Sequence, residues 1–394
     1  MSASDAKPEE LNGSPAVRAT WWTALAADER ARLVTAHPEW IGNSDGILAV
    51  DRDRANRALL PQVKAQLQGE SEALGRTLAD NRFGGAFTAD DTRKWYVDQK
   101  LADIGQLERE LRGSTDRREK RLLVSLDMRS GERGHAAIAV GDPDTADHLG
   151  ITTPGLGTTI NRSLTGELRY QGMVGESILL REEALRQLGC AGRARESVST
   201  VAWIGYDTPN LDGPSRISTA RGAFHVATER KARDTAPVLA RFYAGMRAAS
   251  DRRPHLVAFG HSYGSLVTAE ALRLTDRLVD DAVFYGSPGL GGDRGYDLDY
   301  KPDDFHLTEG GRAYVLKNDG DGVAELGVFG SDPLYSRQLV RLSTHAGVDR
   351  TGVSRVGSVA HAGYTRDVEG KAPMAQYNMA AVLARLPQFL VTGE

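Results

Sequence analysis

The chain has 394 residues, of which 26% are charged and 40% belong to the nine hydrophobic types. This length and balance indicate two domains, or one large domain with an appendage. Lysine and arginine number 49 against 53 aspartate and glutamate, a formal net charge of −4, which gives no electrostatic reason to expect a nucleic-acid partner. No apolar run approaches the ~18 residues of a transmembrane segment, and the polar start shows no classical secretory signal, so we expect a cytoplasmic protein by default. A single cysteine, Cys190, excludes an intramolecular disulfide and a cysteine-rich metal site.

Three regions follow one another along the chain. Residues 1–20 are polar and small, and we expect a flexible tail. Residues 21–115 have helical patterns, with helices predicted over 28–36, 52–67 and 93–112. Pro61 marks a kink or break in the second helix, while Thr92 could cap the third and Gly113 end it. Residues 116–394 form the third region, where the periodicity changes.

In this third region, strand-like runs alternate with helical patterns. Runs at 122–128 and 136–140, joined by a loop with two glycines, predict a hairpin. Further strands are predicted at 148–153, 199–206, 255–259, 281–286, 313–318 and 340–344. Helices are predicted at 166–188, 220–248, 263–274 and 375–390. This alternation predicts an α/β fold: a mostly parallel sheet with helices on both faces and an antiparallel hairpin at one edge.

The strongest local signal is the pentapeptide GHSYG at 260–264, which fits the pattern G-x-S-x-G between a predicted strand and a predicted helix. A serine on such a tight turn projects its hydroxyl above the sheet. Bulky residues two positions away on either side would collide with the neighbouring strand and helix, which explains Gly260 and Gly264. The following helix also directs its positive end toward the serine. We therefore predict Ser262 to be a nucleophile, against the alternative of an ordinary glycine-rich turn.

A serine nucleophile needs a histidine base and a carboxylate, in the chain order serine, acid, histidine. Only His306, His345 and His361 follow the helix after Ser262. His306 precedes the predicted acid strand, and His345 directly follows a strand, where a histidine bonded to the backbone would also fit. His361 lies in a loop before the last helix and is preferred, with His345 as the alternative.

The acid is expected where the strand at 313–318 ends, at the edge where open α/β sheets build their sites. Asp319 and Asp321 both follow this strand, and Asp321 is preferred, the other being a solvated turn residue. Asp332 is a weaker third candidate, because a residue before Pro333 more often caps a turn.

The oxyanion of a tetrahedral intermediate needs two N–H donors. One is expected to be the N–H of Tyr263, directly after the nucleophile, and the other to come from the loop at 153–157, where we choose Leu156. A plain Pro-Gly turn explains that loop equally well when it is taken alone.

Other features receive the simpler interpretation. Asp207 is expected to form a turn, and Trp21 and Trp22 to pack beneath a pair of helices, although an exposed aromatic patch is the alternative. The stretch 295–304 could be a lid or a surface loop. Neither a dinucleotide fingerprint nor a phosphate loop is present, and the dispersed histidines make a metal site improbable, so we expect no cofactor.

Several stretches together resemble a family of α/β hydrolases of unknown function that is widespread in actinobacteria. They are residues 21–25, 37–56, 139–158, 203–210, 260–267 and 285–289, of which GDPDTAD followed by PGLG is the most specific. The resemblance implies an α/β-hydrolase fold with an N-terminal helical appendage, and Ser262 as nucleophile. It also implies a histidine in a G-H-[S]-x-Y-like segment, which is AHAGY at 360–364 here and contains His361. The family's acid segment appears as GDGVA at 320–324, which supports Asp321. Helical regions of this kind make non-classical export the alternative to a cytoplasmic location.

These expectations combine into an esterase or lipase that cleaves a small-molecule or lipid ester through a serine, histidine and aspartate. A thioesterase, amidase or acyltransferase would use the same residues. The alternative from a different class is a hydrolase-like module that binds a partner or small molecule without turnover.

Overall fold

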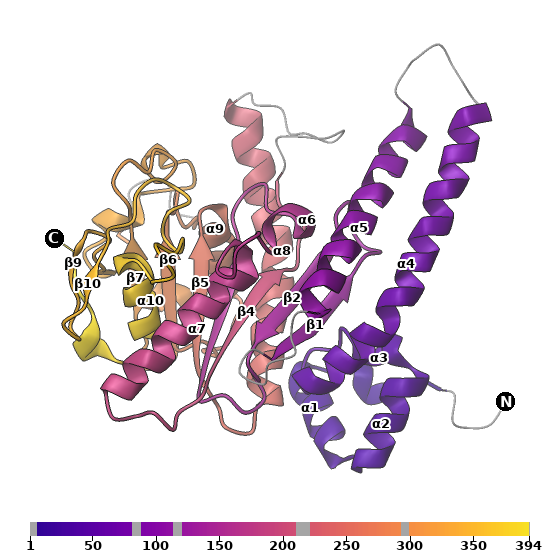
Figure 1. Ribbon diagram of the computed structural model, residues 1–394, viewed down its shortest axis with the longest axis horizontal. Helices are drawn as coiled ribbons and strands as arrows, with labels where there is room; N and C mark the ends of the chain where they lie inside the picture. Colours follow the sequence, from indigo (N-terminus) through magenta and orange to yellow (C-terminus); the bar gives the residue numbers. More distant parts are fainter. Residues whose placement is uncertain (1–5, 81–87, 113–119, 210–220, 293–298, 394) are drawn as a thin grey trace.

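The computed structural model describes residues 6–80, 88–112, 120–209, 221–292 and 299–393, with the backbone alone at 221–227. Its centre is an eight-stranded sheet in the order β1-β2-β4-β3-β5-β6-β7-β8 (Figure 1). All neighbours from β4 to β8 are parallel, whereas β2 is antiparallel to both β1 and β4. The strands are β1 Arg121–Asp127, β2 His135–Val140, β3 His148–Thr153, β4 Val198–Ile204, β5 His255–His261, β6 Asp281–Tyr285, β7 Ala313–Leu316 and β8 Val340–Arg341. The predicted α/β fold with an antiparallel edge hairpin is confirmed.

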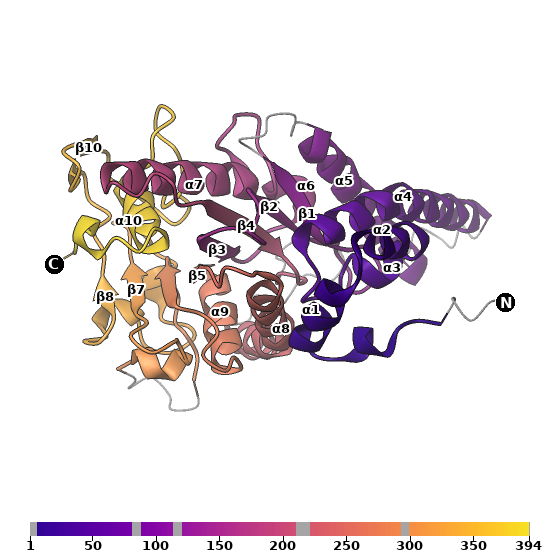
Figure 2. The same cartoon turned by 90° about the horizontal axis from the view of Figure 1, so that it is seen from below.

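Helices cover both faces of this sheet (Figure 2). On one face lie α7 (Gly172–Cys190) and α10 (Met374–Leu383), and on the other α8 (Arg221–Ala249) and α9 (Tyr263–Arg273). Successive residues of a strand point to opposite faces, so β5 sends Leu256 and Ala258 into one core cluster and Val257 and Phe259 into the other. The apolar strands are therefore buried on both sides.

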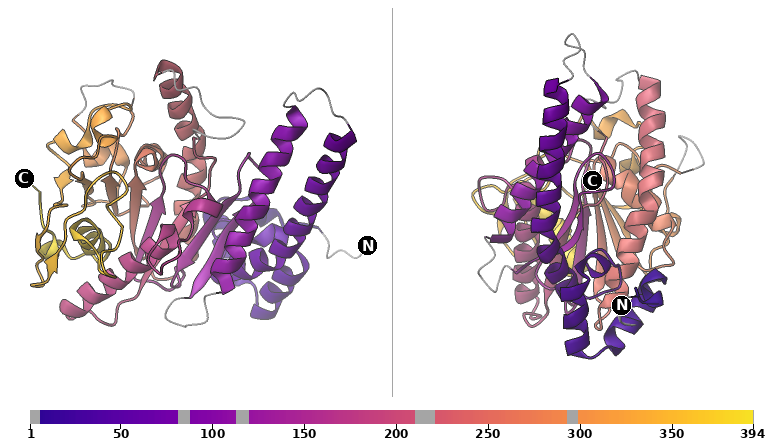
Figure 3. Two further views of the ribbon diagram at one scale, coloured as in Figure 1. Left: turned by 45° about the horizontal axis from the view of Figure 1, so that its top comes forward. Right: turned by 90° about the vertical axis from the view of Figure 1, so that its right-hand side faces the viewer.

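The N-terminal region is helical, as predicted, and stands beside β1 (Figures 1 and 3). It contains α1 Pro15–Ala24, α2 Ala27–Ala36, α3 Pro38–Ile41, α4 Ala49–Asp80 and α5 Ala89–Arg112. Helix α4 runs through Pro61 without ending, so the predicted break does not occur. The cap of α5 is Thr88, whose Oγ1 accepts the N–H of Asp91, and not Thr92. Gly113 lies outside the described residues.

Helical structure begins earlier than the sequence indicated. A 3₁₀ turn at Glu9–Asn12 and the start of α1 lie within the stretch 1–20, for which a flexible tail was expected. The reason is an apolar contact, because Leu11 is buried in the same cluster as Trp22. Trp22 is fully buried and donates its Nε1–H to Asp51 of α4 at 2.8 Å, so it packs beneath the helices as expected.

The edge strand β1 is covered by polar side chains from the helical region. Asn43 bonds both the N–H and the carbonyl of Leu126, and Asp53 and Asn56 bond the N–H and carbonyl of Leu123. An uncovered edge presents unpaired backbone groups to other chains, and these contacts satisfy several of them. Apolar residues of α4 and α5 also share one core cluster with β1, β2 and α7. The helices and the sheet therefore pack as one body.

The remaining elements are short or differ slightly from the prediction. Helix α7 begins at Gly172 because residues 166–171 form a turn closed by the Gly166 N–H on the Gln171 carbonyl. Helix α10 ends at Leu383 and is followed by a 3₁₀ turn at Pro387–Phe389. Other short elements are α6 Ile160–Ser163, β9 Gly347–Val348, β10 Ser354–Arg355, and 3₁₀ turns Pro302–Phe305, Ala324–Leu326 and Pro333–Tyr335. In the part of the chain that the structure describes, no helix has the length and apolar character to cross a bilayer.

Candidate active site

The turn between β5 and α9 holds Ser262 in a strained backbone conformation. Its φ is +54° and ψ is −129°, a region that non-glycine residues rarely adopt. A Cβ on Gly260 would lie 2.6 Å from the Ser265 Cα, and one on Gly264 would lie 2.4 Å from the carbonyl oxygens of Thr153 and Pro154. Both glycines are required by close backbone approach, as the motif predicted. For Gly264, the colliding backbone is the end of β3 and the loop after it.

Three predicted side chains meet at this turn. The His361 Nε2 lies 2.7 Å from the Ser262 Oγ, and the His361 Nδ1 lies 2.8 Å from the Asp321 Oδ1. Ser262 follows β5, Asp321 follows β7, and His361 lies beyond β8. Since the carboxyl ends of parallel strands meet at one edge of the sheet, chain segments 99 and 40 residues apart come together here.

The carboxyl group of Asp321 is fully buried and fully hydrogen-bonded. Its Oδ1 also accepts the N–H groups of Val323 and Ala324 at 3.1 Å, and its Oδ2 accepts the Tyr364 hydroxyl at 2.6 Å. Burial alone would raise the pKa of this carboxyl, but the hydrogen bonds from His361, Tyr364 and the Ala324 N–H outweigh burial and hold the pKa at about 2. Asp321 is therefore ionised at neutral pH.

Two residues that the sequence analysis did not single out complete the surroundings of this carboxylate. The Tyr364 hydroxyl accepts the N–H of Asn318 at 2.8 Å while donating to Asp321. Gly286 has a φ of +61°, and a Cβ there would lie 3.1 Å from the Asp321 Oδ2 and 3.3 Å from the His361 Cε1. Both lie in stretches that carry the family resemblance, 360–364 and 285–289, which was the available signal.

A third unpredicted residue, His261, supports the ring of His361. The two imidazole centroids are 4.9 Å apart, and the His261 Nε2 donates to the His361 carbonyl at 3.0 Å. The ring of His261 also stacks on that of Tyr285, with centroids 4.9 Å apart. Burial and the proximity of His361 lower the pKa of His261 to about 4, so its imidazole is neutral at physiological pH.

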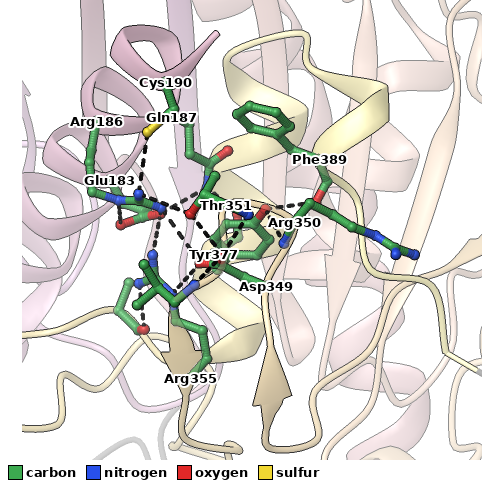
Figure 4. A network of polar contacts seen from close by, with 12 residues as sticks. Glu183, Arg186, Gln187, Cys190, Asp349, Arg350, Thr351, Arg355, Tyr377 and Phe389 are labelled. Atoms are coloured by element: carbon green, nitrogen blue, oxygen red, sulfur yellow. Dashed lines mark hydrogen bonds and ion pairs between the residues drawn. The ribbon is translucent and has the colours of Figure 1, made fainter.

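The segment that carries His361 has little regular structure and is fixed to α7 by buried ion pairs (Figure 4). Arg355 bonds Glu183 at 2.9 Å and Asp349 at 2.8 Å, and Arg186 bonds Glu183 at 2.6 Å. Glu183, Asp349 and Arg355 are almost completely buried, so loss of one partner would leave an uncompensated charge. This network holds the β9–β10 hairpin, and the chain that leads from it to His361, against α7.

The loop after β3 lies directly against Ser262. A Cβ on Gly155 would be 2.7 Å from the Ser262 Cβ and 3.1 Å from its Oγ. The Tyr206 hydroxyl donates to the Pro154 carbonyl at 2.8 Å and holds this loop. Leu156 follows in the same loop, and Tyr263 begins α9, whose first N–H groups have no partner within the helix. Both predicted oxyanion donors thus belong to segments that touch the nucleophile's turn.

The alternative base and acid lie together, away from Ser262. His345 and Asp319 form an exposed pair, with the His345 Nε2 at 3.2 Å from the Asp319 Oδ2 and 67% and 75% of the side chains accessible. His306 contacts the Thr275 carbonyl at 3.3 Å. Asp332 caps the 3₁₀ turn at Pro333 and pairs with Lys317 at 2.9 Å.

The remaining sequence features have structural partners. Asp207 accepts the N–H groups of Glu132 and Arg133 at 2.9 Å and contacts the His135 Nε2 at 3.0 Å, so it holds the β1–β2 turn. Of the stretch 295–304, residues 295–298 lie outside the described part. Within its remainder, Tyr300 is buried and its hydroxyl accepts the Leu290 N–H at 3.2 Å.

Comparison with known proteins places this chain in a family. A family model described as alpha/beta hydrolase matches residues 130–328. The uncharacterized protein Rv2079 of Mycobacterium tuberculosis is 30% identical over 380 residues, which cover 89% of this chain and 52% of that protein. The uncharacterized protein Rv0963c of the same species is 35% identical over 262 residues, covering 64% of this chain and 87% of that protein. The chain therefore spans about half the length of the first relative and most of the second.

Solved structures resemble the fold at low sequence identity. An esterase from Pyrobaculum calidifontis has a TM-score of 0.39 at 14% identity, covering 77% of this chain and 96% of that one. A dienelactone hydrolase from Anabaena variabilis has a TM-score of 0.31 at 15% identity, covering 55% and 83%.

Proposed function

Because the chain belongs to the alpha/beta hydrolase family, we propose that it is a serine hydrolase that cleaves carboxylic esters through an acyl-enzyme. The observation that carries this proposal is the continuous hydrogen-bond relay from Asp321 through His361 to Ser262, with contacts of 2.8 and 2.7 Å. A serine hydroxyl is a weak nucleophile, and an oriented imidazole that can take its proton activates it. The geometry fits that role.

In the first step, Ser262 attacks the ester carbonyl. With the Nδ1–H of His361 donated to Asp321, the Nε2 carries the lone pair that accepts the hydroxyl proton as the Oγ–carbon bond forms. The carbonyl electrons move onto oxygen, and the oxyanion is held by the N–H groups of Leu156 and Tyr263. The positive end of α9 favours this negative charge further.

In the second half, the carbon–oxygen bond to the alcohol breaks and the leaving alkoxide takes the proton from the His361 Nε2. Water then enters, gives a proton to the same nitrogen and attacks the acyl carbon. Collapse of the second intermediate returns the proton to the Ser262 Oγ and releases the carboxylic acid. Asp321 stays ionised throughout, because its pKa of about 2 lies far below the working range, and it stabilises the imidazolium that forms in both steps.

Turnover of a p-nitrophenyl ester series from acetate to dodecanoate tests the proposal. We expect at least one chain length to be hydrolysed by the wild type and Ser262→Ala to lose that activity, with an unchanged thermal unfolding midpoint. Activity on thioesters or amides alone would place the same residues in a thioesterase or amidase. A folded wild type that turns over no substrate, yet binds a small molecule or protein, would favour the non-catalytic binding module.

A further inference from the structure

A cavity lies at the junction of the helical region and the sheet, and Ser262 is not among its lining residues. It has a volume of about 520 Å³ and is lined by α4, α5 and the β1–β2 turn. That volume is within the range of about 300–1,000 Å³ that small-molecule sites occupy. Figure 3 shows α4 and α5 running together along β1 and beyond the end of the sheet.

The cavity opens on the same edge of the sheet as the candidate active site. Ala136, at the start of β2, pairs with Ile204, at the end of β4, so the β1–β2 turn lies at the carboxyl edge of the parallel strands. In the sheet order, β2 and β1 are three and four positions from β5, which leads to Ser262. At about 4.8 Å per strand, the two sites are neighbours but distinct.

One part of the cavity wall is apolar and lies beside a polar part. Val63 and Leu67 of α4, Val97 of α5 and Met128 of the turn line it, and all four side chains are less than a tenth exposed. They belong to the core cluster that joins the helices to the sheet. An aliphatic chain placed here would therefore extend an existing apolar surface.

A buried cation faces these apolar walls. Lys100 is 7% exposed, and its Nζ donates to the Gly131 carbonyl at 2.8 Å. Among the described residues, no carboxylate lies within ion-pair distance of this ammonium. On the same helix, Asp98 is paired with Lys94 at 2.7 Å, and Asp103 is engaged by the N–H groups of Asn161 and Gly134. A buried ammonium with one neutral acceptor has hydrogen-bonding capacity to spare, since it carries three donors.

The rim of the cavity adds to this positive charge. Arg129 bonds the neutral side chain of Gln66 at 3.1 Å, and Arg93 is paired with Glu70 at 2.7 Å. Two acids line the cavity: Glu70, which is neutralised by Arg93, and Glu132, an exposed residue of the β1–β2 turn. The three lining cations therefore leave a net positive charge for an anion that enters with its tail between the helices.

From this arrangement we infer that the cavity binds an amphiphile with a carboxylate head and an aliphatic tail, such as a medium-chain fatty acid. The carboxylate contacts the Lys100 ammonium, with Arg129 at the rim, and the tail packs on Val63, Leu67 and Val97. Charged hydrogen bonds fix the head group, and the tail supplies affinity in proportion to its length. This inference does not depend on the catalytic role of Ser262.

Calorimetric titration with hexanoate, octanoate and decanoate tests the site. We expect each added methylene to tighten the dissociation constant about threefold to fourfold, and octylammonium, which carries the opposite charge, to bind at least about tenfold more weakly than octanoate. Lys100→Met retains the aliphatic stem and should weaken octanoate at least about tenfold. Lys64→Met is the matched control, because Lys64 lies on α4 outside the cavity and pairs with Glu108, and it should leave binding unchanged.

Two further measurements keep the result interpretable. Protein whose Ser262 carries a fluorophosphonate adduct should bind octanoate as the free protein does, which separates this site from the acyl pocket. A diazirine-bearing decanoate should label peptides that contain residues 63–70, 97–100 or 128–132 in the unmutated protein, which needs no variant to fold. Labelling confined to the Ser262 peptide, loss of binding in the adduct, or equal binding by Lys100→Met would overturn the inference and leave Lys100 as a structural cap of the turn.

Discussion

Two aspartate–histidine pairs, whose aspartates are two residues apart in the chain, differ in almost every physical respect. Asp321 is fully buried and bonds His361 at 2.8 Å, whereas Asp319 and His345 are mostly accessible and lie 3.2 Å apart. The buried carboxylate also accepts a tyrosine hydroxyl and two N–H groups. Within the described residues, it is the imidazole of the buried pair that contacts Ser262.

The difference shows that residue type alone does not produce a hydrogen-bond relay from aspartate through histidine to serine. An exposed ion pair is screened by water and contributes about 0–1 kcal/mol. A buried carboxylate keeps its charge only where several donors compensate for lost water, and such donors also fix its direction. Asp319 serves through its backbone instead, because its carbonyl accepts the Ala360 N–H at 3.1 Å, next to His361.

Replacing each histidine with alanine in turn should give the largest difference between the two pairs. His361→Ala removes the proposed base and should lower kcat/KM for the best ester about 10⁴-fold to 10⁶-fold. His345→Ala should change kcat/KM by less than about twofold, since its ring contacts Asp319 on the surface. Steady-state kinetics on purified variants measure both, and a large loss in His345→Ala would reverse the assignment.

The two aspartates should differ almost as strongly. Asp321→Asn places an amide where the imidazole of His361 needs an anion. It also favours the tautomer with the proton on Nε2, which cannot accept the Ser262 proton, so kcat should fall about 10⁴-fold. Asp319→Asn keeps the backbone carbonyl that holds Ala360 and should retain activity within about twofold. Equal effects of the two substitutions on kcat would show that burial does not separate the pairs.

Removing one hydrogen-bond donor from Asp321 should lower kcat/KM less than replacing Asp321 itself. Tyr364→Phe deletes the hydroxyl that bonds the Asp321 Oδ2 at 2.6 Å, a charged hydrogen bond of about 1.5–3 kcal/mol, so we expect kcat/KM to fall about tenfold. Because this donor lowers the pKa of Asp321, its loss raises that pKa toward the unfolded value, and acid unfolding should begin at higher pH than in the wild type. Acid titration followed by circular dichroism measures this shift, with the exposed Tyr335→Phe as control. An unchanged acid transition would leave Tyr364 with a packing role only.

Protonation of His261 should affect stability more than rate. The folded-state pKa of about 4 lies below the ordinary 6.5, so the unfolded chain binds the extra proton between these values and stability falls as pH drops from 6.5 to 4. His261→Gln keeps a neutral donor and cannot take up this proton. The free energy of unfolding of the wild type, relative to that of the variant, should therefore fall by about 3 kcal/mol between pH 7 and pH 4. Urea unfolding of both proteins at several pH values gives the difference, and parallel curves would contradict the account.

The sequence was sufficient for the fold class and for the residues that meet at the elbow. Periodicity separated the helical region from the alternating region, and chain order limited the candidate acids and bases to a few side chains. The order of strands along the chain implies which loops gather at one sheet edge, so Ser262, Asp321 and His361 could be named together.

The features that could not be predicted from the sequence depend on contacts between distant segments of the chain. Nothing local to Pro61 shows that α4 continues through it, because packing on β1 decides the outcome. The capping of β1 by Asn43, Asp53 and Asn56, and the ion pairs that join Arg355 to Glu183, link residues 67 to 172 positions apart. Tyr364 and His261 have their roles only once these segments are in place.

The central claim is that Ser262 is an activated nucleophile, and covalent labelling with a fluorophosphonate tests it most directly. Intact-mass analysis should show one adduct per chain in the wild type, mapped to Ser262 by peptide sequencing. The adduct should be absent in Ser262→Ala, strongly slowed in His361→Ala and formed at the normal rate in His345→Ala. A folded wild type that takes up no label, or takes it up on another residue, would contradict the account.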